Sequence, residues 1–149
     1  MTRLKVQVTT RFGAYDYCKQ NDNVDSVMIS ISTPKRVYDY TPFISDSNGV
    51  KDILFLKFVD KDNGPDIITA SQGEKIAKFV WKYINEPYNI NHIIVHCDAG
   101  TSRSAGVAGA ILKWANNDDS QVFKNNRYIP NMLVYRTVLE SLMERELNG

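Results

Sequence analysis

The sequence has few of the features that define several large protein classes. Two cysteines among 149 residues are too few for a disulfide framework. Lysine and arginine number 18 against 17 acidic residues, so the formal net charge is +1 and no basic surface for nucleic acid is indicated. The first residues lack the apolar core of a secretion signal, and no hydrophobic run is long enough to cross a membrane. We therefore expect a cytoplasmic, monomeric protein in a reducing environment, without a nucleic-acid or membrane partner.

Strand and helix patterns follow one another along the chain without a linker or repeat, which we interpret as one domain over residues 1–149. Strands are predicted where apolar residues alternate or run together, and helices where they recur three or four residues apart. The predicted strands cover 4–8, 27–31, 53–59 and 91–96, and the predicted helices cover 11–20, the segment from the capping boxes at 69–74 to 84, the segment from 106 to about 117, and a last segment from Pro130. This order predicts an α/β fold, with a central, mainly parallel sheet of four to five strands and helices on both sides.

The most informative segment joins the fourth predicted strand to the helix after it. It reads His96-Cys-Asp-Ala-Gly-Thr-Ser-Arg-Ser104, so a cysteine and an arginine lie six residues apart. A tight loop between a buried strand and a helix N-terminus directs successive backbone N–H groups into one concavity. Such a concavity binds an anion, and we interpret it as a phosphate site.

Cys97 and Arg103 have complementary roles at such a site. Only a thiolate attacks well, and both a helix N-terminus and a nearby guanidinium favour the thiolate. Arg103 also offers a planar pair of donors for two phosphate oxygens. A nucleophile at the base of a phosphate site indicates attack on phosphorus through a phosphocysteine intermediate. Ser104 can assist departure of the sulfur, His96 can hold the loop through its ring, and Gly100 lets the backbone approach the oxyanion.

These residues match His-Cys-x-x-Gly-x-x-Arg-Ser, the signature of the cysteine-based protein phosphatases, and the chain resembles their small dual-specificity branch over nearly its whole length. Two segments support the resemblance: 54–60, a strand ending in an acid, and 127–131, which opens the last helix. The resemblance implies a protein-tyrosine-phosphatase-like fold and a phosphoprotein phosphatase that needs no metal or cofactor. Its substrate would be phosphotyrosine, with phosphoserine or phosphothreonine as a further class. The residues implied to bind phosphate are Asp98, Ala99, Gly100, Thr101, Ser102 and Arg103.

The resemblance also implies that Asn131 hydrogen-bonds toward the phosphate loop, although the residue can equally be a plain helix-start residue. The reaction further needs a group that protonates the leaving oxygen and then activates water. Three candidate acids, Asp60, Asp62 and Asp66, follow the third predicted strand. The resemblance places the acid just after the strand, which favours Asp60, with Asp62 as the alternative. At least two of the three are then ordinary solvated acids.

Other functions use parts of the same pattern. The loop also suits a phosphatase of a non-protein ester, such as an RNA 5′-phosphate or a phosphoinositide, but Asp98 and the lack of a loop lysine disfavour a highly anionic substrate. A non-catalytic phosphate-binding module requires a missing or misplaced acid. A redox enzyme such as an arsenate reductase requires resolving cysteines, and Cys18 is the one other cysteine.

Three residues outside the motif have two interpretations each. Cys18 is interpreted as a core residue, with a protective disulfide to Cys97 as the alternative. Lys35 and Arg36 follow the second strand at the sheet edge that carries the site. They are candidates for a substrate rim that attracts anions, and the alternative is a solvated loop.

Overall fold

The structure is a computed structural model that describes residues 3–20, 25–34 and 49–148. In chain order its elements are β1 (Lys5–Thr9), α1 (Arg11–Gln20), β2 (Ser26–Ser32), β3 (Ile53–Lys57), α3 (Ala70–Ile84), β4 (His92–His96), α4 (Arg103–Asn116), α5 (Ser120–Phe123) and α6 (Met132–Asn148). Every strand and helix predicted above is present, α1 with the predicted bounds and the others with one or both ends shifted, and the short α5 is an addition. No helix in these ranges has the length and apolar character needed to cross a membrane.

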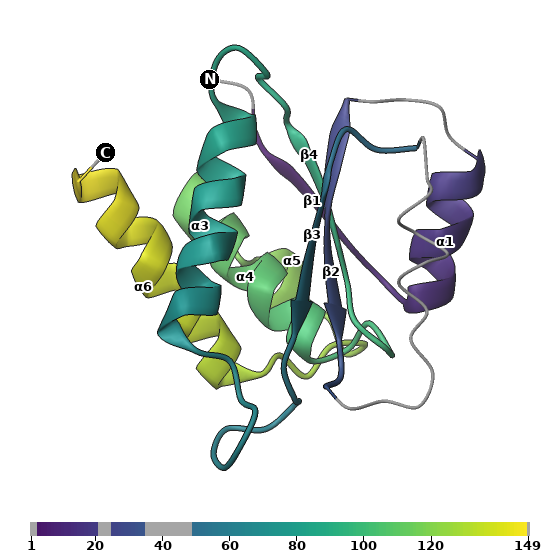
Figure 1. The fold of residues 1–149 in the computed structure, drawn as a ribbon, viewed down its shortest axis with the longest axis vertical. Helices are drawn as coiled ribbons and strands as arrows, with labels where there is room; N and C mark the ends of the chain where they lie inside the picture. The colour runs from purple at the N-terminus through teal and green to yellow at the C-terminus, as the bar shows by residue number, and fades with distance from the viewer. Residues whose placement is uncertain (1–2, 21–24, 35–48, 149) are drawn as a thin grey trace.

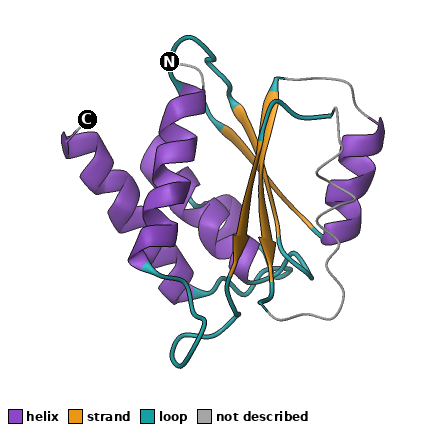
Figure 2. Cartoon of the chain, viewed as in Figure 1, coloured by secondary structure: helices purple, strands orange, loops and turns teal. Residues whose placement is uncertain are grey.

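The four strands form one sheet in the order β1-β4-β2-β3, and all three strand pairs are parallel. Parallel neighbours need crossover connections, and α1 lies between β1 and β2 in the chain and α3 between β3 and β4. Helix α1 covers one face of the sheet, while α3, α4, α5 and α6 lie on the other (Figures 1 and 2). The predicted α/β architecture with a parallel sheet and helices on both sides is therefore confirmed.

Burial follows from these layers. Every residue of β2 is buried, as expected for a central parallel strand covered on both faces. Alternate residues of β4 point to opposite faces. Thus Ile93 and Val95 belong to the large core under α3, α4 and α6, whereas Ile94 belongs to a smaller core under α1. Cys18 lies in that smaller core and Cys97 in the large one, and both are free thiols. The interpretation of Cys18 as a packing residue is confirmed.

Local sequence signals explain how the helices begin and pack. Thr69 caps α3, and a capping box joins its side chain and backbone to Gln72, so the first of the two predicted boxes is the one used. Gly106 lets α4 approach the start of α6, because a Cβ at this position would lie 2.7 Å from the carbonyl oxygen of Asn131. This contact brings the segment before α6 against the N-terminal turn of α4.

The carboxyl ends of the four strands meet at one edge of the sheet, which is where ligands bind in folds of this kind. The residue that follows each strand closely is polar or ionisable: Arg11 after β1, Thr33 after β2, Asp60 after β3 and Cys97 after β4. The fold thereby brings together four short segments that are far apart in the sequence.

Candidate active site

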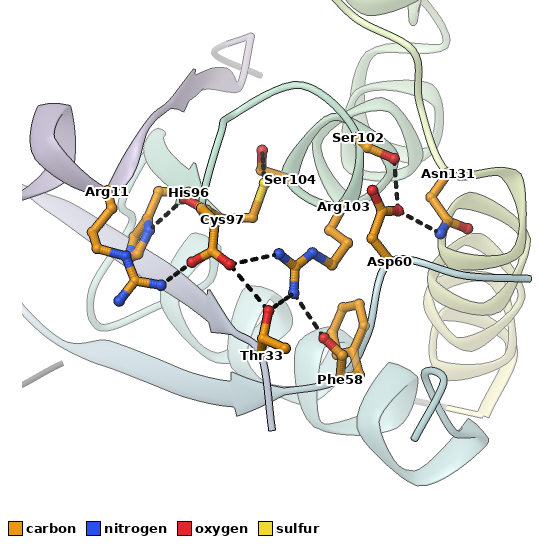
Figure 3. A network of polar contacts seen from close by, with 11 residues as sticks. Arg11, Thr33, Phe58, Asp60, His96, Cys97, Ser102, Arg103, Ser104 and Asn131 are labelled. Carbon is orange, nitrogen blue, oxygen red and sulfur yellow. Dashed lines mark hydrogen bonds and ion pairs between the residues drawn. The ribbon is translucent and has the colours of Figure 1, made fainter. Parts of the chain in front are cut away.

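The loop between β4 and α4 holds Cys97 at its start, at the sheet edge. The thiol is almost fully buried, with 3% of the residue exposed, and its Sγ lies 3.1 Å from the Oγ of Ser104 in the first turn of α4 (Figure 3). Ser104 is itself fully buried. A hydroxyl at this distance can donate a hydrogen bond to a thiolate and stabilise its charge.

His96 anchors the start of this loop from inside the sheet. Its Nδ1–H donates to the carbonyl oxygen of Cys97 at 3.3 Å, and its Nε2 accepts from the Oγ of Ser30 at 2.7 Å. The proton of the neutral ring is therefore on Nδ1, because the carbonyl oxygen of Cys97 can only accept a hydrogen bond. Burial, with a smaller contribution from the charges of Arg11 and Arg103, lowers the pKa of His96 to about 4, although the bond to Cys97 and the charge of Asp98 act in the opposite direction. The ring is therefore neutral at pH 7 and serves as a fixed donor.

The middle of the loop needs a residue without a side chain. Gly100 has a φ of 69°, in the left-handed region, and a Cβ there would lie 2.8 Å from the carbonyl oxygen of Thr9 at the end of β1. Any larger residue would strain the backbone and push the loop off β1. The glycine therefore allows the loop to turn tightly against the neighbouring strand.

The far side of the loop is held by the segment that precedes α6. The backbone N–H groups of Ile129 and Asn131 donate to the carbonyls of Thr101 and Ser102, at 2.9 and 3.0 Å. In a trans peptide the C=O and the N–H point in opposite directions. The N–H groups of Ser102 and Arg103 consequently point away from this segment, as an inward-facing phosphate cradle requires.

Ser102 occupies the N-cap position of α4, but its side chain makes no capping hydrogen bond. Its Oγ instead donates to the Oδ1 of Asp60 at 2.7 Å. The N–H groups of the first helical turn are thus not satisfied by the cap side chain, and a helix N-terminus of this kind attracts anions. The geometry supports the anion site that the sequence predicts.

Arg103 is buried beside this site, and its guanidinium is fixed by three neighbours. One terminal nitrogen donates to the Oγ1 of Thr33 at 3.1 Å and to the carbonyl oxygen of Phe58 at 2.8 Å. The other donates to the Oδ2 of Asp98 at 3.1 Å. Within the described part of the chain, these bonds leave Nε and one further N–H hydrogen for a ligand. Figure 3 shows Thr33, which follows β2, and Phe58, which follows β3, beside this side chain.

Asp98 lies between two arginines. Its Oδ2 accepts from Arg103 and from the Oγ1 of Thr33, and its Oδ1 pairs with Arg11 from the end of β1. Burial alone raises the pKa of Asp98, but the hydrogen bonds from Arg11, Thr33 and Arg103 outweigh it, so the pKa lies below its ordinary value. The carboxylate is charged at neutral pH, and its charge is balanced by the arginines.

Asp60 lies on the other side of the loop from this ion-pair cluster (Figure 3). Its Oδ1 accepts from Ser102 and from the Nδ2 of Asn131 at 2.9 Å, and Asn131 also donates to the carbonyl oxygen of Lys61 at 3.2 Å. The loop that carries Asp60 is closed by a hydrogen bond from the N–H of Val59 to the carbonyl of Asp66. Asp62 is exposed in the same loop. Of the candidate acids, Asp60 is the one held against the phosphate loop.

The structure thus brings together most of the residues that the sequence singled out. His96 and Ser104 hydrogen-bond to Cys97, Arg103 hydrogen-bonds to Asp98 of the same loop, and Asp60 and Asn131 meet the loop through Ser102 and its backbone. The proposed rim residues Lys35 and Arg36 lie outside the described residues. Within the described residues, no cluster of three or more His, Cys, Asp or Glu side chains is arranged to hold a metal ion.

Sequence reasoning missed two members of the site, Arg11 and Thr33. Each directly follows a parallel strand, or lies one residue beyond it, at the sheet edge that carries Cys97. Their position relative to the strand ends was the available signal. What was lacking was the strand order, which places β1 and β2 on either side of β4.

No protein-family model matches the sequence, and no curated protein matches it. Solved structures do match. PTPMT1 in complex with PI(5)P aligns with a TM-score of 0.59 at 18% identity, over 97% of this chain and 94% of that chain. The Cydia pomonella PTP-2 phosphatase aligns with a TM-score of 0.62 at 20% identity, over 91% and 84%, and human DUSP28 with 0.57 at 10%, over 97% and 95%.

These similarities show the fold. The protein-tyrosine-phosphatase-like fold that the resemblance implied is therefore confirmed.

Proposed function

We propose that the protein is a cysteine-dependent phosphatase that hydrolyses phosphate monoesters without a metal ion. One observation carries the proposal: the Sγ of Cys97 lies 3.1 Å from Ser104 in a loop that also holds Arg103 and contacts Asp60. A nucleophile, a phosphate-binding cation and a carboxyl group are therefore arranged around one anion site. The similar folds of known phosphatases support the same chemistry.

In the first step, the Cys97 thiolate attacks phosphorus while the loop amides and Arg103 hold the non-bridging oxygens. A sulfur–phosphorus bond forms and the ester phosphorus–oxygen bond breaks. The leaving oxygen takes a proton from the carboxyl group of Asp60, and the alcohol or phenol departs. The phosphoryl group then remains on Cys97.

In the second step, the Asp60 carboxylate takes a proton from a water molecule that attacks phosphorus. A phosphorus–oxygen bond forms, the sulfur–phosphorus bond breaks, and inorganic phosphate leaves. The electron pair returns to Cys97 as a thiolate, which the hydroxyl of Ser104 stabilises through a hydrogen bond. Asp60 is again protonated, and the cycle closes.

We propose phosphotyrosine in proteins as the substrate, with phosphoserine and phosphothreonine as a further class. A phosphoinositide is a second candidate, and one observation favours it. Asp98 was counted against a highly anionic head group, yet in the structure its charge is paired with both Arg11 and Arg103. The complex of PTPMT1 with PI(5)P gives a suitable second substrate to compare.

The proposal is tested with an aryl phosphate in reducing buffer that contains a metal chelator. We expect turnover that vanadate inhibits and that disappears in Cys97→Ser. Turnover in Cys97→Ser at the wild-type rate would overturn the cysteine mechanism. The ratio of kcat/KM for a phosphotyrosine peptide to that for a soluble PI(5)P then decides between the two substrate classes.

A further inference from the structure

The phosphate loop contains an acidic side chain where a cation would be more favourable. Asp98 directly follows Cys97, so its carboxylate repels both a thiolate and a phosphate dianion. It is also hydrogen-bonded to Arg103, the residue proposed to bind phosphate, at 3.1 Å. If Asp98 and Arg103 were the only charged residues here, the carboxylate would cancel the positive charge that the guanidinium offers to the substrate phosphate.

Arg11 supplies the missing charge. Its guanidinium forms an ion pair with the Oδ1 of Asp98, while Arg103 pairs with the Oδ2. The Arg11 and Arg103 side chains are 8% and 7% exposed, and that of Asp98 is 26% exposed. Together the three side chains carry one net positive charge in a mostly dehydrated setting, where charges interact more strongly than in water.

The sheet explains why Arg11 reaches this position. Strands β1 and β4 are parallel neighbours in which Thr9 pairs with His96. Arg11 and Asp98 each lie two residues further along their chains, so the register continues into a pair of opposite charges. The strand pairing itself therefore brings the guanidinium to the carboxylate.

We propose that Arg11 is a positioning residue that binds Asp98 and thereby leaves the charge of Arg103 available to the substrate phosphate. The proposal rests on the proposed function, since it assigns a role within that phosphate site. Arg11 acts through Asp98 and does not touch the reacting atoms. Its loss removes one of the two guanidinium groups paired with Asp98 and leaves the carboxylate to Arg103, whereas loss of both Arg11 and Asp98 removes the carboxylate that opposes the charge of Arg103.

The test is a double-mutant cycle of Arg11→Met, Asp98→Asn and the double variant, with the full chain. We expect Arg11→Met to raise both KM for the aryl phosphate and the dissociation constant of tungstate roughly tenfold or more, with a smaller change in kcat. Asp98→Asn should bind tungstate at least as tightly as the wild type. The double variant should recover most of the lost affinity. Arg3→Met, which removes an exposed arginine paired with Asp118 at the opposite end of β1, is the matched control and should change neither constant.

The rate at which Cys97 is alkylated gives a second readout that does not require turnover. Iodoacetate is an anion and iodoacetamide is neutral, so the ratio of their alkylation rates at Cys97 reports the electrostatic potential at the thiol. We expect this ratio to fall about tenfold in Arg11→Met and to recover in the double variant. Asp98→Asn, which keeps the shape of the side chain, should raise the ratio. This variant therefore tests the inference even if Arg11→Met does not fold.

Unchanged tungstate affinity and an unchanged alkylation ratio in Arg11→Met would overturn the inference. So would a double variant that is as weak as Arg11→Met, because Arg11 would then act through packing alone. Failure of the proposed function has a different signature, in which the wild type shows no turnover that depends on Cys97. Tungstate binding and alkylation would still measure the effect of Arg11 in that case.

Discussion

The side-chain Nδ2 of Asn131 lies 2.9 Å from the Oδ1 of Asp60, and the hydroxyl oxygen of Ser102 lies 2.7 Å from the same Oδ1. Asn131 belongs to the segment that leads into α6, and its own backbone N–H donates to the carbonyl of Ser102. One residue thus connects the loop after β3 to the phosphate loop. This connection sets the position of Asp60 relative to Cys97.

If Asp60 protonates the leaving oxygen, its removal should matter most when that oxygen is a poor leaving group. We expect Asp60→Asn to lower kcat about a hundredfold or more on an alkyl phosphate and far less on an activated aryl phosphate. Asp62→Asn is the matched control, because Asp62 is an exposed acid in the same loop. Steady-state rates on the two substrates check this. A larger loss in Asp62→Asn would move the acid to Asp62.

Loss of the Asn131 side chain should disturb Asp60 without removing it. We expect Asn131→Ala to lower kcat on the alkyl phosphate roughly tenfold, because a misaligned acid transfers its proton less well. Tungstate affinity should stay near the wild-type value. Asn148→Ala, at the exposed end of α6, is the control. Equal losses on both substrates would contradict a role that acts through Asp60.

Ser104 should affect the second step more than the first. Without its hydroxyl the departing thiolate lacks a hydrogen bond, so Ser104→Ala should hydrolyse the phosphoenzyme slowly. We expect a burst of phenol release followed by a steady rate about tenfold below that of the wild type. Rapid-mixing measurements with an activated aryl phosphate check this, with the exposed Ser71→Ala as control. A uniformly slow reaction without a burst would place the effect on the first step.

The neutral, buried ring of His96 makes the stability of the protein sensitive to acid. The pKa of His96 is lowered from 6.5 to about 4, so below pH 6.5 the unfolded chain takes up a proton that the folded protein excludes. The resulting loss of unfolding free energy grows as the pH falls from 6.5 toward 4, and reaches about 2 kcal/mol at pH 5.

Urea unfolding of wild type and His96→Gln at pH 7 and pH 5 measures this contribution. The variant is expected to be less stable at pH 7, because it loses the bonds to Ser30 and Cys97. It should nevertheless lose about 2 kcal/mol less than the wild type between the two pH values. His92→Gln, which changes the half-buried second histidine, is the control and should alter the pH dependence less. Identical pH dependences in wild type and His96→Gln would show that the ring is protonated in the folded protein.

Local patterns in the sequence were sufficient to predict the fold and the centre of the site. The apolar run before Cys97, the loop and the helix after it are contiguous, so their geometry follows from neighbouring residues. The parallel sheet was predictable for a similar reason, since three of the four strand patterns are followed by a helix pattern. The Thr69 cap of α3 is likewise a contact between residues close in sequence.

Contacts between distant segments were harder to predict. Arg11 has a role because β1 lies beside β4, and no local pattern states which strands are neighbours. The sequence favoured Asp60 as the acid but left Asp62 as the alternative. The path of the short loop after β3 decides which of the two carboxyl groups faces the phosphate loop, and local sequence patterns do not predict that path. Asp98 was assessed as a single charge, whereas its effect depends on the two arginines that contact it.

The central claim, a phosphocysteine on Cys97, is tested most directly by trapping the intermediate. Ser104→Ala is mixed with excess aryl phosphate, quenched within one turnover in alkaline denaturant, digested and analysed by mass spectrometry. The account predicts one phosphoryl group on the peptide that contains Cys97, and none when Cys97→Ser is added to the same variant. Turnover with no phosphoryl group on that peptide, or with the group on another residue, would contradict it.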